Sequence, residues 1–308
     1  MIIDFFYPHS LNQVLEIIQT NPDAKFIAGG TDLIPNFKQK NVKASAFIDV
    51  KSIPELTKIV ETNEEVSIGA ALTLYEIEKS EVVKKYFEIL IGSAKSIASP
   101  VIRKSATIGG NVLCENRCVF YNQSEWWRES IGNCLKCNGD ICIATGGKKN
   151  CFSKHSSDLS PALLVCNAKV KIVNKKGIQL LDLEKIYSGD GIKPHYLNND
   201  DLVVSFHLPK IKRKFFYFKL RQRESIDFSS LTIAMSYENN SKTLRIALGS
   251  VDPKPILWIY SKNSEQTFED FVKTNIKKVR IVDNDYYSRE YRKNILLKKI
   301  HSAYSQIL

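Results

Sequence analysis

The amino-terminal third of the chain alternates helical and strand-like patterns of hydrophobic residues. Apolar residues recur at helical spacing over residues 11–18, after the capping-box pattern Ser10-Leu-Asn-Gln13, which predicts a helix that ends at Asn21-Pro22. A second capping pattern, Thr73-Leu-Tyr-Glu76, begins another helix, and residues 82–98 predict a longer helix that ends before Pro100. Short apolar runs between these helices predict strands at residues 25–28, 46–49 and 66–68.

The regular pattern is lost between residues 114 and 151, where the chain is polar, aromatic and rich in cysteine. No helix or strand is predicted there, and so long a structureless loop inside a compact domain needs a specific reason. Regular patterns resume at residues 161–173. A hairpin turn at residues 175–177 and an alternating strand at residues 202–208 follow.

The chain becomes strongly basic near residues 210–214, and we place a domain boundary there. Beyond it, residues 215–220, 231–237 and 244–248 predict a three-stranded antiparallel sheet, and two amphipathic helices follow, the last from about Ser288. The patterns therefore predict an α+β fold, with a first domain over residues 1–210 and a smaller carboxy-terminal domain over residues 211–308.

Composition adds that the chain is an ordinary globular protein. Its 308 residues are 44% hydrophobic and 25% charged, and no apolar run approaches the ~18 residues of a membrane helix. Since the amino terminus also lacks a basic leader, we expect a cytoplasmic protein with no membrane contact. The net charge of +11 suits an anionic cofactor or an acidic partner, and no signature of nucleic-acid binding accompanies it.

Two glycine pairs are candidate phosphate-binding turns. Gly29-Gly30 follows a predicted strand, and such a turn can direct backbone N–H groups into one concavity that seats a phosphate. Gly109-Gly110, followed by the amide of Asn111, can form a second wall of the same kind. Neither pair has the G-x-G-x-x-G spacing of a Rossmann fold, and a Gly-Gly after a strand is also an ordinary tight turn.

Six of the seven cysteines lie between residues 114 and 151, which indicates a metal site. Spacing alone leaves two ligand sets open. One has the paired spacing of a structural zinc site and consists of Cys114, Cys118, Cys134 and Cys137. The other spreads its thiolates widely enough to wrap a 4Fe-4S cluster and consists of Cys118, Cys134, Cys142 and Cys151.

Five motifs occur in a fixed order along the chain. They are Ala28-Gly-Gly-Thr-Asp-Leu33, Thr107-Ile-Gly-Gly-Asn111, Ser157-Asp158-Leu-Ser-Pro-Ala-Leu163, Lys219-Leu-Arg221 through Asp227-Phe228, and Arg245-Ile-Ala-Leu-Gly249. With these motifs the chain resembles, over nearly its whole length, the FAD-binding medium subunits of the molybdenum hydroxylases, the family of xanthine dehydrogenase and carbon monoxide dehydrogenase. The resemblance implies a PCMH-type FAD-binding domain of two α/β subdomains, followed by a carboxy-terminal domain of the carbon monoxide dehydrogenase flavoprotein type.

The resemblance also implies which residues bind FAD. It places the pyrophosphate and ribityl chain against the two glycine motifs, a cofactor hydroxyl or phosphate-side group at Asp158, and the flavin ring near Val203 and Lys219. A lysine near the ring would stabilise negative charge as electrons arrive. The expected cofactor-binding residues are Ile27, Ala28, Gly29, Gly30, Thr31, Asp32, Thr107, Gly109, Gly110, Asn111, Asp158, Val203 and Lys219.

The cysteine-rich segment carries a narrower resemblance. Most medium subunits join the Gly-Gly-Asn motif to the Ser-Asp motif by a short connection, whereas here an insertion occupies residues from about 114 to 155. The run from Arg117 to Arg128 and the cysteines after it resemble the extra loop of 4-hydroxybenzoyl-CoA reductase beta subunits. That resemblance implies a 4Fe-4S cluster on Cys118, Cys134, Cys142 and Cys151. Cys114 and Cys137 would be bystanders, although Cys137 is close enough to Cys134 to replace it.

The implied function is that of an oxidoreductase subunit that relays electrons and holds no catalytic residue for the organic substrate. Ferredoxin would supply electrons to the cluster, and FAD would pass them to a 2Fe-2S small subunit and a molybdenum large subunit, in a dimer of heterotrimers that removes the ring hydroxyl of 4-hydroxybenzoyl-CoA. Two other interpretations stay open: a medium subunit of a xanthine or aldehyde dehydrogenase-like hydroxylase, and a zinc-stabilised basic binding module. The five histidines are scattered, and we interpret them as structural or surface residues.

Overall fold

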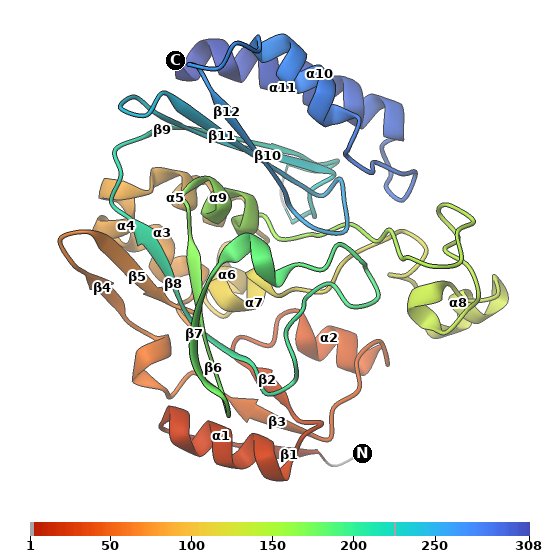
Figure 1. Ribbon diagram of the computed structural model, residues 1–308. Helices are drawn as coiled ribbons and strands as arrows, with labels where there is room; N and C mark the ends of the chain where they lie inside the picture. Colours follow the sequence, from red (N-terminus) through yellow and green to blue (C-terminus); the bar gives the residue numbers. More distant parts are fainter. Residues whose placement is uncertain (1–2, 225) are drawn as a thin grey trace.

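A small parallel sheet with flanking helices forms the amino-terminal unit (Figure 1). The computed structural model describes residues 3–224 and 226–308. The strand order is β1–β3–β2, and the elements are β1 (Asp4–Phe6), α1 (Leu11–Thr20), β2 (Lys25–Ile27), α2 (Leu33–Lys38) and β3 (Ala46–Asp49). The predicted first helix is confirmed: the Ser10 side chain accepts a hydrogen bond from the Gln13 amide at 3.3 Å, and Val14 and Ile18 are buried.

The second unit is a five-stranded antiparallel sheet in the order β4–β5–β8–β6–β7. Its strands are β4 (Ile59–Glu61), β5 (Glu65–Gly69), β6 (Lys169–Asn174), β7 (Gly177–Asp182) and β8 (Leu202–Pro209). Its helices are η1 (Pro54–Leu56), α3 (Leu74–Lys79), α4 (Glu81–Tyr86), α5 (Glu88–Lys95), α6 (Pro100–Arg103), α7 (Ile108–Val112), α9 (Leu159–Val165) and η3 (Leu183–Ile186). Apolar residues of this sheet and of α3, α5 and α9 form the largest core.

The long helix predicted over residues 82–98 is divided in two. Phe87 leaves the helical conformation, with φ of −140° and ψ of 53°, between α4 and α5. Its side chain is fully buried, so the break lets the ring enter the core while each short helix packs its own apolar face.

The cysteine-rich segment leaves the body of the molecule after α7 and returns before α9 (Figure 1). The prediction that it holds no helix was wrong, because α8 (Glu125–Ser130) and the short η2 (Leu135–Cys137) lie within it. Ser124 caps α8 by accepting a hydrogen bond from the Trp127 amide at 3.2 Å. Helix α8 has too few residues for periodicity to reveal it.

A four-stranded antiparallel sheet in the order β12–β11–β10–β9 forms the carboxy-terminal unit. It contains β9 (Lys214–Leu220), β10 (Leu231–Glu238), β11 (Thr243–Gly249), β12 (Ile256–Ser261), α10 (Phe268–Ile276) and α11 (Arg289–Ile307). The three predicted strands are confirmed, and β12 is a fourth that the prediction missed. Helices α10 and α11 cover one face of this sheet, and α5 and α9 lie against the other (Figure 1).

No helix formed by residues 3–224 and 226–308 combines the length and the apolar character needed to cross a membrane.

Candidate functional site

The first glycine pair forms the turn between β2 and α2. Gly30 has a φ of +65°, a left-handed conformation that favours glycine. A Cβ on Gly29 would overlap the carbonyl oxygen of Ser105, so this turn packs directly on the backbone before the second glycine motif. Among the described residues, the amides of Gly29, Gly30 and Thr31 donate to no protein acceptor. They are free to donate to an anionic ligand, as the sequence predicts.

The second glycine pair is already hydrogen-bonded within the protein. Gly109 donates its amide to the Ala70 carbonyl at 2.8 Å, Gly110 to the Thr107 hydroxyl at 3.1 Å, and Asn111 to the Thr107 carbonyl at 2.9 Å. The Asn111 amide is thus already paired within the protein, and its contact with an anion stays a prediction. These amides already donate to protein acceptors. What Gly109 and Gly110 offer the cavity is a wall that lacks side chains.

One cavity of about 470 Å³ joins the two glycine turns, within the size range of cofactor sites. Ten of the thirteen residues expected to bind FAD line it: Ile27, Ala28, Gly29, Gly30, Thr31, Asp32, Thr107, Gly109, Gly110 and Val203. The loop over residues 192–195 lines it as well. Sequence reasoning missed this loop because it carries no glycine pair and no motif. Free amides, a side-chain-free wall and the cavity's size together fit the pyrophosphate of a dinucleotide.

The three remaining residues brace the cavity from outside its lining. The Asn111 side-chain oxygen accepts hydrogen bonds from the Ser157 hydroxyl at 2.8 Å and the Leu159 amide at 3.2 Å. Asp158 and Lys219 form an ion pair of 2.7 Å, and each side chain is only 5% exposed. Asp158 and Lys219 therefore satisfy one another and tie α9 to β9, and their direct contact with FAD stays a prediction.

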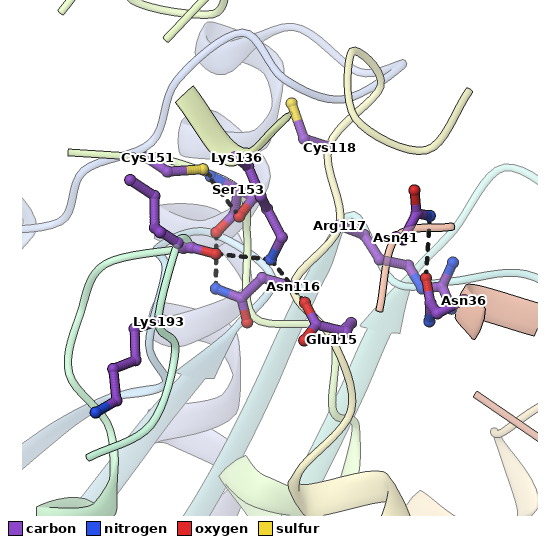
Figure 2. A network of polar contacts seen from close by, with 12 residues as sticks. Asn36, Asn41, Glu115, Asn116, Arg117, Cys118, Lys136, Cys151, Ser153 and Lys193 are labelled. Atoms are coloured by element: carbon purple, nitrogen blue, oxygen red, sulfur yellow. Dashed lines mark hydrogen bonds and ion pairs between the residues drawn. The ribbon is translucent and has the colours of Figure 1, made fainter. Parts of the chain in front are cut away.

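The cysteine segment begins at the wall of this cavity (Figure 2). Cys114 and Glu115 line the cavity. The Asp32 carboxylate accepts hydrogen bonds from the Arg117 guanidinium at 2.6 Å and from the Glu115 amide at 3.0 Å. These contacts anchor the start of the insertion to the first glycine turn.

The four cysteines of the wider ligand set are all at least partly buried. Cys134, Cys142 and Cys151 are buried, Cys118 is partly buried, and all seven cysteines of the chain are free thiols. Burial raises the pKa of Cys118 to about 11, and the nearby thiols of Cys151 and Cys134 add to that shift. Cys151 is in turn influenced by Cys142, although burial is the main cause of its raised pKa.

Within residues 3–224 and 226–308, no three His, Cys, Asp or Glu side chains are gathered tightly enough to hold a single metal ion. Burial raises the pKa of Cys114, and the charges of Asp32, Asp158 and Glu115 add to that shift while Arg117 opposes it.

Cys134 and Cys137 share a hydrogen bond between their side chains, which identifies the more acidic of the two. The bond from Cys137 lowers the pKa of the Cys134 thiol, and the same bond raises the pKa of Cys137. A lowered pKa favours the thiolate, the form that ligates metals, at Cys134.

An aromatic cluster connects the cavity to the interior. His155 is fully buried, and neither ring nitrogen has a hydrogen-bond partner among the described residues. Its ring meets Tyr187 edge-on at a centroid distance of 4.9 Å, and His195, which lines the cavity, lies 5.6 Å from Tyr187. Burial lowers the pKa of His155 to about 3 and that of His195 to about 4. Sequence reasoning missed His195 because no motif surrounds it.

We expect His155 to make the protein acid-sensitive. Its folded pKa of about 3 lies below the ordinary value of about 6.5, so its contribution to stability is fully present above pH ~6.5 and falls as pH drops toward about 3. His155→Phe keeps the ring contact with Tyr187 but cannot be protonated. Urea unfolding at about pH 7 and about pH 5 should show a smaller loss of stability in this variant than in the wild type. Exposed His9→Phe is the control, and equal losses in all three proteins would contradict the expectation.

Comparison with known proteins extends these observations. Residues 1–211 match the family described as FAD binding domain in molybdopterin dehydrogenase. The xanthine dehydrogenase FAD-binding subunit of Escherichia coli O157:H7 is 25% identical over 264 residues, which cover 83% of this chain and 77% of that subunit. The aldehyde oxidoreductase FAD-binding subunit PaoB of Escherichia coli (strain K12) is 29% identical over 248 residues, covering 77% of each chain.

The fold is shared with a solved structure as well. Quinoline 2-oxidoreductase from Pseudomonas putida 86 superposes with a TM-score of 0.72 at 18% identity, over 96% of this chain and 92% of that chain. The fold and the sequence relatives define an FAD-binding subunit of an oxidoreductase. The chain belongs to the family of FAD-binding domains of molybdopterin dehydrogenases, as a medium subunit of the molybdenum hydroxylase type. The predicted fold class is thereby confirmed.

Proposed function

We propose that this subunit carries FAD between its two glycine turns and a 4Fe-4S cluster on Cys118, Cys134, Cys142 and Cys151, and that it relays electrons in a complex like 4-hydroxybenzoyl-CoA reductase. FAD binding is the property of the family, whereas the cluster is specific to the inserted segment. The observation that supports the cluster is the burial of these thiols together with their mutual influence: the charges of Cys134 and Cys151 act on Cys118, and the charge of Cys142 acts on Cys151.

The chain's own residues have distinct roles toward FAD. The free amides of the turn at Gly29 and Gly30 suit the pyrophosphate, while Gly109 and Gly110 let the cofactor approach the backbone closely. Val203 offers an apolar surface for the ring, and the 192–195 loop also lines the cavity. When bound, FAD supplies a carrier that exchanges electrons with iron-sulfur partners. Lys219 is held in place by its ion pair with Asp158.

The resemblance of the inserted segment supports a cluster over zinc. A zinc ion draws four sulfurs to about 2.3 Å from one point, which places them about 3.8 Å apart. A cubane holds its ligands farther apart, because four irons and four sulfides lie between them. The lowered pKa of Cys134 supports it, and not Cys137, as the second ligand.

The proposed partners follow from the resemblance to 4-hydroxybenzoyl-CoA reductase. A molybdenum large subunit and a 2Fe-2S small subunit would complete a dimer of heterotrimers, and ferredoxin would be the electron donor. The net charge of +11 suits an acidic ferredoxin, whose association should weaken as salt rises. A second candidate is a medium subunit of the xanthine or aldehyde dehydrogenase type, which the matches over 83% and 77% of the chain favour.

Anaerobic purification followed by cofactor assays distinguishes these functions. We expect one FAD with about four irons and four acid-labile sulfides per chain, and broad visible absorption beneath the flavin bands. FAD without iron or sulfide would favour the second candidate. A colourless protein that contains zinc would contradict both and favour a zinc-stabilised binding module.

A further inference from the structure

Lys136 is a buried cation at the junction between the cysteine segment and the cavity wall (Figure 2). Its side chain is only 5% exposed. The ammonium group lies 2.8 Å from the Glu115 carboxylate and donates to the Gly191 carbonyl at 2.6 Å. It also lies 4.9 Å from the centroid of the Tyr121 ring. A lysine is buried in this way only when its charge is compensated, so these contacts are specific ones.

One polar partner of Lys136 lines the cavity and the other adjoins its lining. Glu115, at the start of the insertion, lines the cavity. Gly191 immediately precedes the 192–195 loop, which also lines it. The ammonium group therefore connects the cavity-lining start of the insertion to a loop that is far away in sequence.

The loop that carries Gly191 also contacts Cys151. The Gly191 amide donates to the Cys151 carbonyl at 2.9 Å, and the Asp190 carboxylate accepts from the Cys151 amide at 3.0 Å. A Cβ on Gly191 would lie 2.8 Å from the Cys151 sulfur, so the loop backbone packs directly on that thiol. One short loop thus touches a proposed cluster ligand at one end and the cavity at the other.

Lys136 is also close to a proposed cluster ligand. It donates to the carbonyl of Gly191, the same residue whose amide donates to the Cys151 carbonyl and whose backbone packs on the Cys151 sulfur. Arg128 is another buried cation of the segment. Arg128 is bound to the Gln123 and Tyr121 carbonyls and makes no contact with the wall among its described hydrogen bonds. Lys136 is the cation that reaches both sites.

We infer that Lys136 is a positioning residue that couples the two cofactor sites: it balances the negative charge of the thiolate set and, through Glu115 and Gly191, holds the cavity wall in place. The inference rests on the proposed function. Coupling of this kind is reciprocal, so occupation of the cluster site should tighten FAD binding, and FAD should favour occupation of the cluster site to the same degree.

Two substitutions distinguish the effect of the Lys136 charge from the effect of the position of its side chain. Lys136→Met removes the ammonium at similar length, and Lys136→Arg keeps the charge but changes the geometry at Glu115 and Gly191. Lys40→Met is the matched control, because Lys40 also pairs with a glutamate of the insertion, Glu125, at 2.8 Å, but its side chain is 73% exposed.

The FAD dissociation constant, measured by fluorescence quenching, and the cluster midpoint potential, measured by EPR-monitored titration, are the readouts. Lys136→Met should weaken FAD binding at least about tenfold, because Glu115 and the 192–195 loop lose the bond that holds them in place at the cavity, and should make the midpoint potential more negative. Lys136→Arg should weaken FAD binding while leaving the potential near the wild-type value. FAD affinity and potential equal to those of Lys40→Met would overturn the inference.

Glu115→Gln provides a second route if Lys136→Met does not fold. Removal of the carboxylate should shift the potential in the opposite, positive direction, since Lys136 is then uncompensated. An unchanged potential in this variant also overturns the inference. Iron, sulfide and FAD contents are measured in every preparation. Wild-type protein without iron contradicts the proposed function, whereas full contents with unchanged properties contradict only the role of Lys136.

Discussion

Replacement of Cys142 or Cys151 with serine will abolish bound iron and acid-labile sulfide, and replacement of Cys114 will leave both in place. Cys142 and Cys151 are buried thiols of the proposed ligand set, and a cubane that loses one of four thiolate ligands is not retained. Cys114 lies in the lining of the cavity. Iron and sulfide assays after anaerobic purification, together with absorbance near the cluster bands, check the expectation.

Two further variants make this test sharper. Cys137→Ser should retain iron and Cys134→Ser should lose it, because the pKa of Cys134 is lowered and that of Cys137 is raised. Cys166→Ser is the control, since Cys166 is a fully buried thiol in a different part of the core. Loss of iron in Cys114→Ser with retention in Cys142→Ser would reverse the ligand assignment.

Gly29→Ala will eliminate FAD binding, although it adds only one methyl group. The new Cβ would overlap the Ser105 carbonyl oxygen, so the turn must move away from the backbone that carries the second glycine motif. That movement separates the free amides from the opposite wall of the cavity. Flavin released by denaturing the purified protein, and titration of apoprotein with FAD, measure the effect.

Gly92→Ala is the matched control for a methyl group added to a glycine. Gly92 lies within α5, and a Cβ there would meet no atom within 4 Å. This variant should keep its FAD and gain about 0.5–1 kcal/mol in the free energy of unfolding. If Gly29→Ala fails to fold, Gly110→Val carries the test, because Gly110 lines the cavity and its Cβ would meet only the Thr107 hydroxyl, at 3.0 Å. A Gly110→Val protein with wild-type FAD affinity would contradict FAD binding in this cavity.

Much of the local structure could be predicted from the sequence. The capping pairs at Ser10 and Thr73 mark the helix starts correctly, because a cap satisfies amides within the same few residues. The strands β3 and β8 could also be predicted, because an alternating or continuous apolar pattern is set by neighbouring residues. The missed strand, β12, follows Pro253 and Pro255 closely and finds its partner only in β11.

The candidate site likewise has features that the sequence predicts and features that it does not. The order of the glycine motifs in the sequence pointed to the family, and ten expected residues line the cavity, because these residues provide backbone and need few distant partners. The hydrogen-bond acceptor of each glycine amide could not be predicted, since the Gly109 amide donates to the carbonyl of Ala70, a residue in another segment.

Glycine spacing, cysteine spacing and hydrophobic periodicity are properties of neighbouring residues, so the sequence by itself determined the fold class, the two turns and the presence of a thiol-rich insertion. The tertiary structure determined the remaining features of the site. Only the folded protein brings Glu115, Lys136 and Gly191 within hydrogen-bond distance and places Cys114 and His195 in the cavity wall. Such contacts depend on how distant segments pack, and no local pattern encodes them.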